Sequence, residues 1–199
     1  MLEKMSKKIG AEEFYDKLAA NYDDTLKDSK VNAQHVNEAV KIFHRHNHHQ
    51  GNVLDIGCGT GNLSKLLQGD FEYTGIDISG KMLDYAAQRG YKTIHKPIET
   101  ALDQIETKSF DFVFSLSSLL CVEDGATAIE HMHRIARKTI LISLDETTEE
   151  YIKNFVVPVY DHSKIIVKDT IEDYFIVGWT SPTTGIPIRT RMIYIEQES

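Results

Sequence analysis

The sequence contains few cysteines and prolines and no long apolar segment. Two cysteines and four prolines occur among its 199 residues, and two isolated cysteines are typical of reduced thiols in the cytoplasm rather than of a disulfide framework. The longest uncharged apolar run, residues 112–122, contains three serines and is too short to cross a hydrocarbon core about 30 Å thick. Residues 1–10 have lysines but no apolar stretch, so no signal peptide is expected. We therefore expect a cytoplasmic protein that does not bind membranes.

Basic residues are also too few for a nucleic-acid partner. The chain has 30 Asp and Glu residues against 22 Lys and Arg, a formal charge of −8 at pH 7, whereas a nucleic-acid backbone is bound by a basic surface. Hydrophobic residues make up 41% and charged residues 26%, as in ordinary globular domains. A chain of this length buries roughly 70% of its surface on folding, so it needs no disulfide or metal to fold. These proportions predict one domain over residues 1–199.

Strand and helix patterns alternate through the middle of the chain. Short apolar runs bounded by glycine or turn residues predict strands at 52–56, 71–76, 91–94, 110–116 and 139–144. Apolar residues at helical spacing predict helices between these strands, at 62–68, 79–88 and 124–137. This alternation implies parallel strands joined by right-handed crossovers. We therefore predict the α/β class, with a Rossmann-like, doubly wound and mostly parallel sheet.

The two ends of the chain show other patterns. Residues 11–46 carry apolar residues at helical spacing and predict two helices. β-Branched and aromatic residues at 165–167, 171–179 and 188–195 predict strands, and the turn residues of 181–187 lie between the last two. An antiparallel C-terminal hairpin is therefore expected at the edge of the sheet.

A glycine-rich turn follows the first predicted strand of the sheet. Residues 53–63 read VLDIGCGTGNL, so the strand leads into Gly57, Gly59 and Gly61 before a helix begins. Glycine allows a sharp turn and a close approach to a ligand, and the helix N-terminus presents free N–H groups. This pattern favours a nucleotide-type site at the carboxyl edge of the sheet. The dinucleotide fingerprint needs a third glycine one position later, where this chain has Asn62, and this argues against a nicotinamide cofactor.

Two acidic residues accompany the turn. Asp55 interrupts an apolar strand, where a carboxylate is costly unless a partner is present. A ligand ammonium would be such a partner, whereas a pyrophosphate would be repelled; alternatively Asp55 accepts hydrogen bonds from loop amides alone. Asp77 ends the second strand and could accept hydrogen bonds from both hydroxyls of a ribose. A role for Asp77 as a helix cap is less favoured, because Ser79 already supplies the cap.

These motifs resemble those of class I S-adenosylmethionine-dependent methyltransferases. VLDIGCGTGNL is similar to their first motif, FEYTGIDIS at 71–79 to their second, and SFDFVFSLSSLL at 109–120 to the motif of their fourth strand. AEEFYDKLAANYDD at 11–24 is similar to the opening helix of small-molecule members. The resemblance implies S-adenosyl-L-methionine as cofactor and a small molecule as methyl acceptor.

The resemblance also implies roles for individual residues. Ile78 would pack on the adenine, and the backbone carbonyls of Ser115 and Leu116 would approach the methionyl amine. The expected cofactor-binding residues are Asp55, Gly57, Cys58, Gly59, Gly61, Asp77, Ile78, Ile98, Ser115 and Leu116. The domain is then divided into a helical lid segment (1–46), a cofactor-binding core (52–145) and C-terminal strands (146–199).

The sequence departs from the family pattern at two places. Many relatives carry an acidic residue after the third strand that meets the adenine amino group, but here Pro97 occupies this region and has no N–H to offer. The amide of Ile98 or the carboxylate of Glu99 could replace that contact. Residues 134–138 also lack the Pro-Gly-Gly turn that is common before the fifth strand, so a shorter connection is expected there.

Several reactive side chains are assigned structural roles. Cys58 is interpreted as a small packing residue, Ser117 and Ser118 lack the surroundings of a nucleophile elbow, and His131 and His133 are expected on the surface of their helix. The four histidines of residues 44–49 could form a metal patch, but a frayed helix end before Gly51 explains them as well, so no metal site is predicted.

The lid segment supplies the candidates for catalysis. Phe14 and Leu18 are expected to pack on the domain, whereas Tyr15 and Tyr22 could exclude water and orient an acceptor. Methyl transfer from a sulfonium is an in-line displacement in which the protein mainly positions the acceptor. The sequence thus predicts methyl transfer to a small molecule; alternatives are a non-catalytic or regulatory S-adenosylmethionine-binding protein, and a protein methyltransferase with an open groove.

Overall fold

Seven strands form one mixed sheet in the computed structural model, which describes residues 8–24, 32–180 and 184–197. The strands are β1 (Gln50–Ile56), β2 (Asp70–Asp77), β3 (Lys92–His95), β4 (Phe110–Ser115), β5 (Ala136–Glu146), β6 (Thr170–Thr180) and β7 (Pro187–Glu196). Their order is β3-β2-β1-β4-β5-β7-β6, with β1 to β5 parallel and β7 antiparallel to both of its neighbours. The predicted α/β class, the doubly wound parallel sheet and the antiparallel C-terminal hairpin are confirmed.

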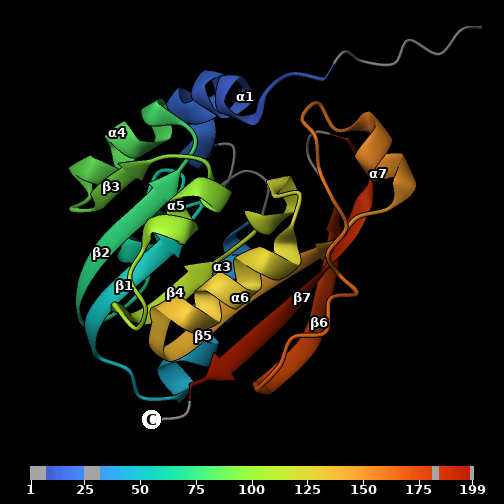
Figure 1. Cartoon of the computed structure of the whole chain (residues 1–199). Helices are drawn as coiled ribbons and strands as arrows, with labels where there is room; N and C mark the ends of the chain where they lie inside the picture. The colour runs from blue at the N-terminus through green and yellow to red at the C-terminus, as the bar shows by residue number, and fades with distance from the viewer. Residues whose placement is uncertain (1–7, 25–31, 181–183, 198–199) are drawn as a thin grey trace, which may run out of the picture.

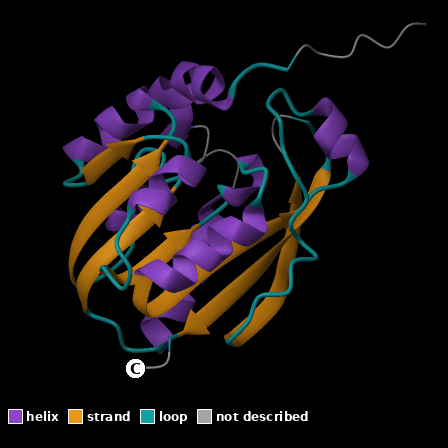
Figure 2. Ribbon diagram, viewed as in Figure 1, coloured by secondary structure: helices purple, strands orange, loops and turns teal. Residues whose placement is uncertain are grey.

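Helices cover both faces of this sheet (Figures 1 and 2). They are α1 (Ala11–Leu18), η1 (Ala19–Asn21), α3 (Asn32–Arg45), η2 (Asn62–Lys65), α4 (Gly80–Gln88), α5 (Ile98–Gln104), η3 (Leu119–Cys121), α6 (Gly125–Ile135) and α7 (Glu149–Asn154). Helices α5 and α6 pack on the face that carries Leu54 and Ile56, and α3 and η2 pack on the face that carries Val53. Successive residues of β1 thus belong in turn to two hydrophobic cores, one on each face of the sheet, as expected for a strand that is buried on both faces. Among the described residues, no helix combines the length and apolar character that crossing a membrane requires.

The register of the strands brings three connecting segments to one edge of the sheet. Ile56, the last residue of β1, pairs with Ile76 on one side and with Ser115 on the other. The backbone N–H groups of Gly57 and Cys58 both donate to the carbonyl of Ile76, at 2.8 and 3.0 Å. The glycine-rich turn, the end of β2 and the loop after β4 therefore lie side by side beneath α1 (Figure 1).

Most predicted elements are present, and two short helices were missed. Ser79 caps α4 through the backbone N–H of Met82, as the sequence indicated, and Asp124 caps α6 through that of Thr127. Helix α6 ends at Ile135 and β5 starts at the next residue, which accounts for the missing Pro-Gly-Gly turn. Helices α5 and α7, of seven and six residues, are too short to show a clear helical period in the sequence.

The predicted strand at 165–167 is wrong. Its residues do alternate in burial, since Val167 is buried and Ile166 is 90% exposed. Within the described part of the chain, no strand pairs with them; instead the guanidinium of Arg191 donates hydrogen bonds to the carbonyls of Ser163 and Ile165, at 3.1 and 2.7 Å. A side chain thus takes the place of a strand partner. Residues 181–183 of the predicted hairpin turn lie outside the described residues.

The histidines after α3 pack on the sheet rather than fray into solvent. Helix α3 ends at Arg45, and Asn47, at φ +57°, turns the chain before Gly51 is reached. The ring of His46 stacks on Tyr194 with ring centroids 4.0 Å apart, and His48 Nε2 lies 3.3 Å from the Tyr194 hydroxyl. The interpretation of this segment as a frayed end before Gly51 is therefore wrong.

Candidate functional site

A cavity of about 460 Å³ opens at the carboxyl ends of β1, β2 and β4. Its volume lies in the range of small-molecule sites in proteins. Ten of the predicted site residues line it: Tyr15, Tyr22, Asp55, Gly57, Cys58, Gly59, Asp77, Ile78, Ile98 and Leu116. The structure thus brings together one set of residues from the sheet edge and two tyrosines from the opposite end of the sequence. Gly61 and Ser115 lie just outside the lining.

The glycine-rich turn needs glycine because of its backbone conformation and its neighbours. Gly57 has φ +68°, and a Cβ at this position would lie 2.2 Å from the Cβ of Ser118. Gly61 has φ +77°, and its Cβ would lie 3.0 Å from the ring of Tyr91. Both positions combine a left-handed backbone with close packing, which a larger residue would strain. Gly57 therefore shapes the cavity wall, whereas Gly61 fits the turn against Tyr91.

Asp55 is buried at the cavity and has a protein partner that the sequence did not indicate. The hydroxyl of Tyr91 donates a hydrogen bond to one carboxylate oxygen of Asp55 at 2.9 Å. Burial raises the pKa of Asp55 to about 7, although the hydrogen bond from Tyr91 acts in the opposite direction. Neither sequence interpretation included this hydroxyl. The Tyr91 hydroxyl occupies only one oxygen of Asp55, and no described residue donates a hydrogen bond to the other.

Both carboxylate oxygens of Asp77 accept hydrogen bonds from the main chain. One carboxylate oxygen accepts from the N–H of Gly59 at 2.9 Å and the other from the N–H of Ser79 at 2.8 Å. Burial raises the pKa of Asp77, and these amide donors act against the rise. A carboxylate has about four lone-pair positions, so acceptor capacity is left on the cavity side. Asp77 therefore holds the glycine-rich turn in place and is also available to hydroxyl donors.

The start of α5 forms another wall of the cavity. Ile78 follows Asp77, and Pro97, Ile98 and Glu99 all line the cavity beside it. Pro97 precedes the first helical residue of α5, a position that proline tolerates because the first N–H groups of a helix have no intrahelical partner. Pro97, at which this sequence departs from the family pattern, therefore lies at the cavity.

Tyr15 and Tyr22 close the cavity from the N-terminal segment, residues 8–24. The hydroxyl of Tyr15 lies 4.0 Å from Cys121 Sγ. Burial raises the pKa of both tyrosines, so both hydroxyls stay protonated at neutral pH. Phe14 points elsewhere and packs edge-on against Phe155 with ring centroids 5.9 Å apart. Phe14 thus packs on the domain and both tyrosines line the cavity, whereas their role in orienting an acceptor stays a prediction.

Other reactive side chains have structural partners. Burial raises the pKa of the Cys58 thiol, which packs with Leu83, Ala86 and Tyr91, so Cys58 is not an activated nucleophile. Ser118 Oγ donates to the carbonyl of Ile56 at 2.8 Å and thereby ties the loop after β4 to β1.

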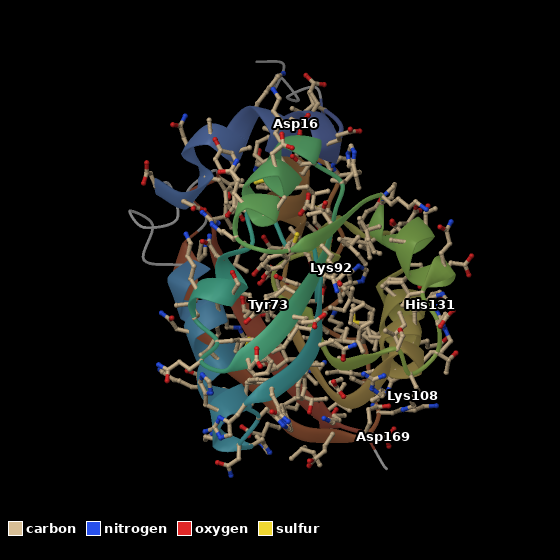
Figure 3. The ribbon with its side chains drawn as sticks, turned by 90° about the vertical axis from the view of Figure 1, so that its left-hand side faces the viewer. Asp16, Tyr73, Lys92, Lys108, His131 and Asp169 are labelled. Carbon is tan, nitrogen blue, oxygen red and sulfur yellow. The ribbon has the colours of Figure 1, made fainter. Side chains whose placement is uncertain are left out.

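The histidines of α6 lie away from the cavity. His131 interacts with Arg134, with Nδ1 3.1 Å from the guanidinium, and Figure 3 shows it on α6, well below Asp16 of the N-terminal segment. His133 Nδ1 lies 3.2 Å from the side-chain amide of Gln197. Neither histidine lines the cavity, so neither is placed to act as a base there.

Comparison with known proteins gives matches along the core of the chain. Residues 54–142 match a family model described as a methyltransferase domain. The uncharacterized protein MJ1252 of Methanocaldococcus jannaschii is 31% identical over 137 residues, which cover 65% of this chain and 49% of that protein. The chain spans about half or less of the length of the curated relatives that it matches.

Solved structures resemble almost the whole chain. The N-methyltransferase NodS from Bradyrhizobium japonicum, in complex with S-adenosyl-L-homocysteine, superposes with a TM-score of 0.71 at 16% identity and covers 96% of this chain and 100% of its own. The magnesium protoporphyrin IX methyltransferase of Synechocystis with bound SAH gives a TM-score of 0.67 at 19% identity and covers 94% of this chain and 97% of its own. At these identities the likeness is one of fold.

Proposed function

Because the chain belongs to the class I S-adenosylmethionine-dependent methyltransferase family, we propose that it transfers the methyl group of S-adenosyl-L-methionine to a small-molecule acceptor. One observation carries the proposal: two buried carboxylates, Asp55 and Asp77, lie at the carboxyl ends of adjacent strands and line one cavity around a glycine turn. A solved neighbour is named for a small-molecule substrate, magnesium protoporphyrin IX. The cytoplasmic location and the single-domain organisation stay predictions from the sequence.

The residues at the cavity fit this cofactor by their chemistry. Asp55 would hold the ammonium of the methionyl group, because one of its oxygens is left over by Tyr91. Asp77 would accept the ribose hydroxyls with the lone pairs that its amide donors leave unused. Ile78 and Ile98 offer an apolar surface for the adenine ring. Gly57 and Gly59 present backbone without side chains, which allows a close approach.

The cofactor supplies an activated methyl group and its leaving group when it is bound. The chain has to hold the acceptor in line with that methyl group and exclude water, an effect that can lower a barrier by several kcal/mol. Tyr15 and Tyr22 have protonated hydroxyls at the cavity and can donate hydrogen bonds to an acceptor. Val36, Leu116 and Val122 line the same cavity and are apolar, which favours an acceptor with an apolar body.

The proposed cofactor is tested by calorimetry. We expect S-adenosyl-L-methionine and S-adenosyl-L-homocysteine to bind the purified chain, and NAD to give no heat. Turnover of a panel of small amines, phenols, thiols and carboxylic acids, followed by mass spectrometry, separates an enzyme from a binding protein. Binding of NAD at micromolar concentration without the sulfonium cofactor would overturn the proposal. Methylation of intact proteins with no small-molecule product would favour a protein substrate instead.

The affinity for the cofactor is expected to depend on pH through Asp55. The ionised carboxylate attracts an ammonium group, whereas the protonated form does not, and the pKa of Asp55 is raised to about 7. Affinity should therefore rise with pH through this pKa, by about eightfold between pH 6 and pH 7.5. Calorimetry at both pH values measures the change. Asp55→Asn should bind weakly at both values with no pH dependence, and a flat profile for the wild-type chain would contradict the assignment.

A further inference from the structure

The N-terminal segment is held to the glycine-rich turn by an ion-pair cluster around Asp23. One carboxylate oxygen of Asp23 accepts from Thr60 Oγ1 at 2.6 Å and from the side-chain amide of Asn62 at 3.0 Å. The other oxygen pairs with the guanidinium of Arg89 and lies 3.4 Å from Lys65 Nζ. We call these residues the Asp23 cluster. Its members come from the N-terminal segment, the glycine-rich turn, η2 and the end of α4.

Arg89 connects the same turn to α4. Its guanidinium donates to the carbonyl of Thr60 and, at 3.2 Å, to the side-chain oxygen of Asn62. Thr60 is buried, and the side chains of Asp23 and Arg89 are 25% and 19% exposed. Burial would raise the pKa of Asp23, but the hydrogen bonds from Thr60 and Arg89 outweigh it and lower the pKa to about 2. Asp23 is therefore ionised throughout the neutral range.

A second ion pair in the N-terminal segment is exposed, unlike the partly buried Asp23 cluster. Glu13 pairs with Lys17 on the outer surface of α1, with side chains 56% and 67% exposed. Exposed pairs of this kind contribute little, because water and salt screen them. The Asp23 cluster is partly buried and joins residues distant in sequence, so its loss should loosen the N-terminal segment more than the loss of the Glu13 pair.

The cluster is also next to the cavity residue Tyr22. Asp23 follows Tyr22 in the chain, and a Cβ on Gly59 would lie 3.6 Å from the Tyr22 ring. Both Tyr22 and Asp23 line the cavity, together with Gly59 of the glycine-rich turn. The position of Asp23 thus fixes where the Tyr22 ring lies relative to the turn. A ligand in the cavity beside Gly59 and Tyr22 would leave when this arrangement opens.

We propose that Asp23 is a positioning residue that keeps the N-terminal segment closed over the cofactor, so that breaking the Asp23 cluster admits and releases the cofactor. The inference rests on the proposed function for the identity of the ligand. It assigns Asp23 an action through Tyr22 and the glycine-rich turn. Closure of the segment and retention of the cofactor are then two readouts of one contact.

The experiment compares Asp23→Asn and Asp23→Glu with the matched control Glu13→Gln, which removes one negative charge from the same segment. Stopped-flow measurement of S-adenosyl-L-homocysteine dissociation should show release about fivefold faster from Asp23→Asn. Asp23→Glu should recover part of the loss, and Glu13→Gln should release the ligand at the wild-type rate. In steady-state turnover, the kcat of Asp23→Asn should fall, whereas its KM for the methyl acceptor should change less.

A second readout needs no ligand. Amide hydrogen exchange of residues 11–24 in the ligand-free chain should speed up in Asp23→Asn and stay unchanged in Glu13→Gln. Arg89→Gln, which removes the same ion pair from α4, should reproduce both effects and serves if Asp23→Asn does not fold. Unchanged release and unchanged exchange in both variants would overturn the inference. Failure of the wild-type chain to bind S-adenosyl-L-homocysteine would instead reject the proposed function, and the exchange measurement would still decide whether Asp23 holds the segment.

Discussion

Replacement of Asp77 by alanine is expected to weaken the binding of S-adenosyl-L-methionine by about 2–3 kcal/mol, which is about 30- to 150-fold. The variant removes the proposed acceptor of the ribose hydroxyls. It also frees the N–H groups of Gly59 and Ser79, which the carboxylate holds at 2.9 and 2.8 Å, so the turn loses its shape. Calorimetry with the wild-type chain and the variant measures the difference directly.

The same variant should lose some stability, which needs a control. The N–H of Ser79 is buried and that of Gly59 is partly buried, so leaving them without an acceptor costs about 1–3 kcal/mol. Ile193→Val, in the core on β7, should cost about 0.5–1.5 kcal/mol without touching the cavity. If this control binds the cofactor normally, weak binding by Asp77→Ala reflects the site and not stability. An affinity of Asp77→Ala within twofold of wild type would show that Asp77 only shapes the turn.

Deletion of residues 1–28 is expected to leave a folded protein that still binds cofactor but turns over at least tenfold more slowly. The deletion removes Tyr15 and Tyr22, and with them the part of the cavity wall that these tyrosines form. Loss of such a cover acts mainly on the catalytic rate, because water enters and the acceptor is no longer aligned. Steady-state turnover and cofactor calorimetry on the truncated chain test both parts of this expectation.

Single substitutions separate the effect of the two tyrosines at the cavity from the effect of losing the packing contacts of the N-terminal segment. Phe14 packs on Phe155, and Asp16 accepts from Ser79 Oγ at 2.6 Å, so the deletion also removes structural contacts. Asp16 lies on α1 beside α4, as Figure 3 shows. Tyr15→Phe and Tyr22→Phe keep the rings and should slow turnover less than the deletion does. If the truncated chain keeps full activity, the cover has to come from the loop of residues 117–123, whose Ser117, Ser118 and Cys121 line the same cavity.

The core of the fold could be predicted because its signals are local. Apolar runs, glycine positions and caps within a few residues of each other specify β1, the glycine-rich turn and the start of α4. The alternation of strand and helix then limits the topology to a parallel sheet. The secondary structure after residue 145 was harder to predict from local patterns. It was expected to be committed to strands, but α7 forms there and Phe155 next to it packs against the N-terminal segment.

The partners of the site residues could not be predicted, because each pair is distant in sequence. The hydroxyl of Tyr91 reaches Asp55 across 36 positions, and Arg89 reaches Asp23 across 66. Arg89 is the C-terminal cap of α4, and Tyr91 immediately precedes β3. The local sequence indicates only a helix end and the start of a strand there. Nothing in their local pattern indicates a contact, since the contact exists only after β1, β2 and α4 have packed.

The place of β7 in the sheet has a consequence for how the chain assembles as it is made. Within the described part of the chain, β1 to β4 pair with strands that precede residue 147, whereas β5 also pairs with β7 and β6 meets the sheet only through β7. Until residues 187–196 have left the ribosome, β5 has an open edge and β6 has no partner. An open apolar edge is a template for unwanted pairing with other chains. The hairpin of β6 and β7 therefore covers the edge of β5 only after the other five strands have been made.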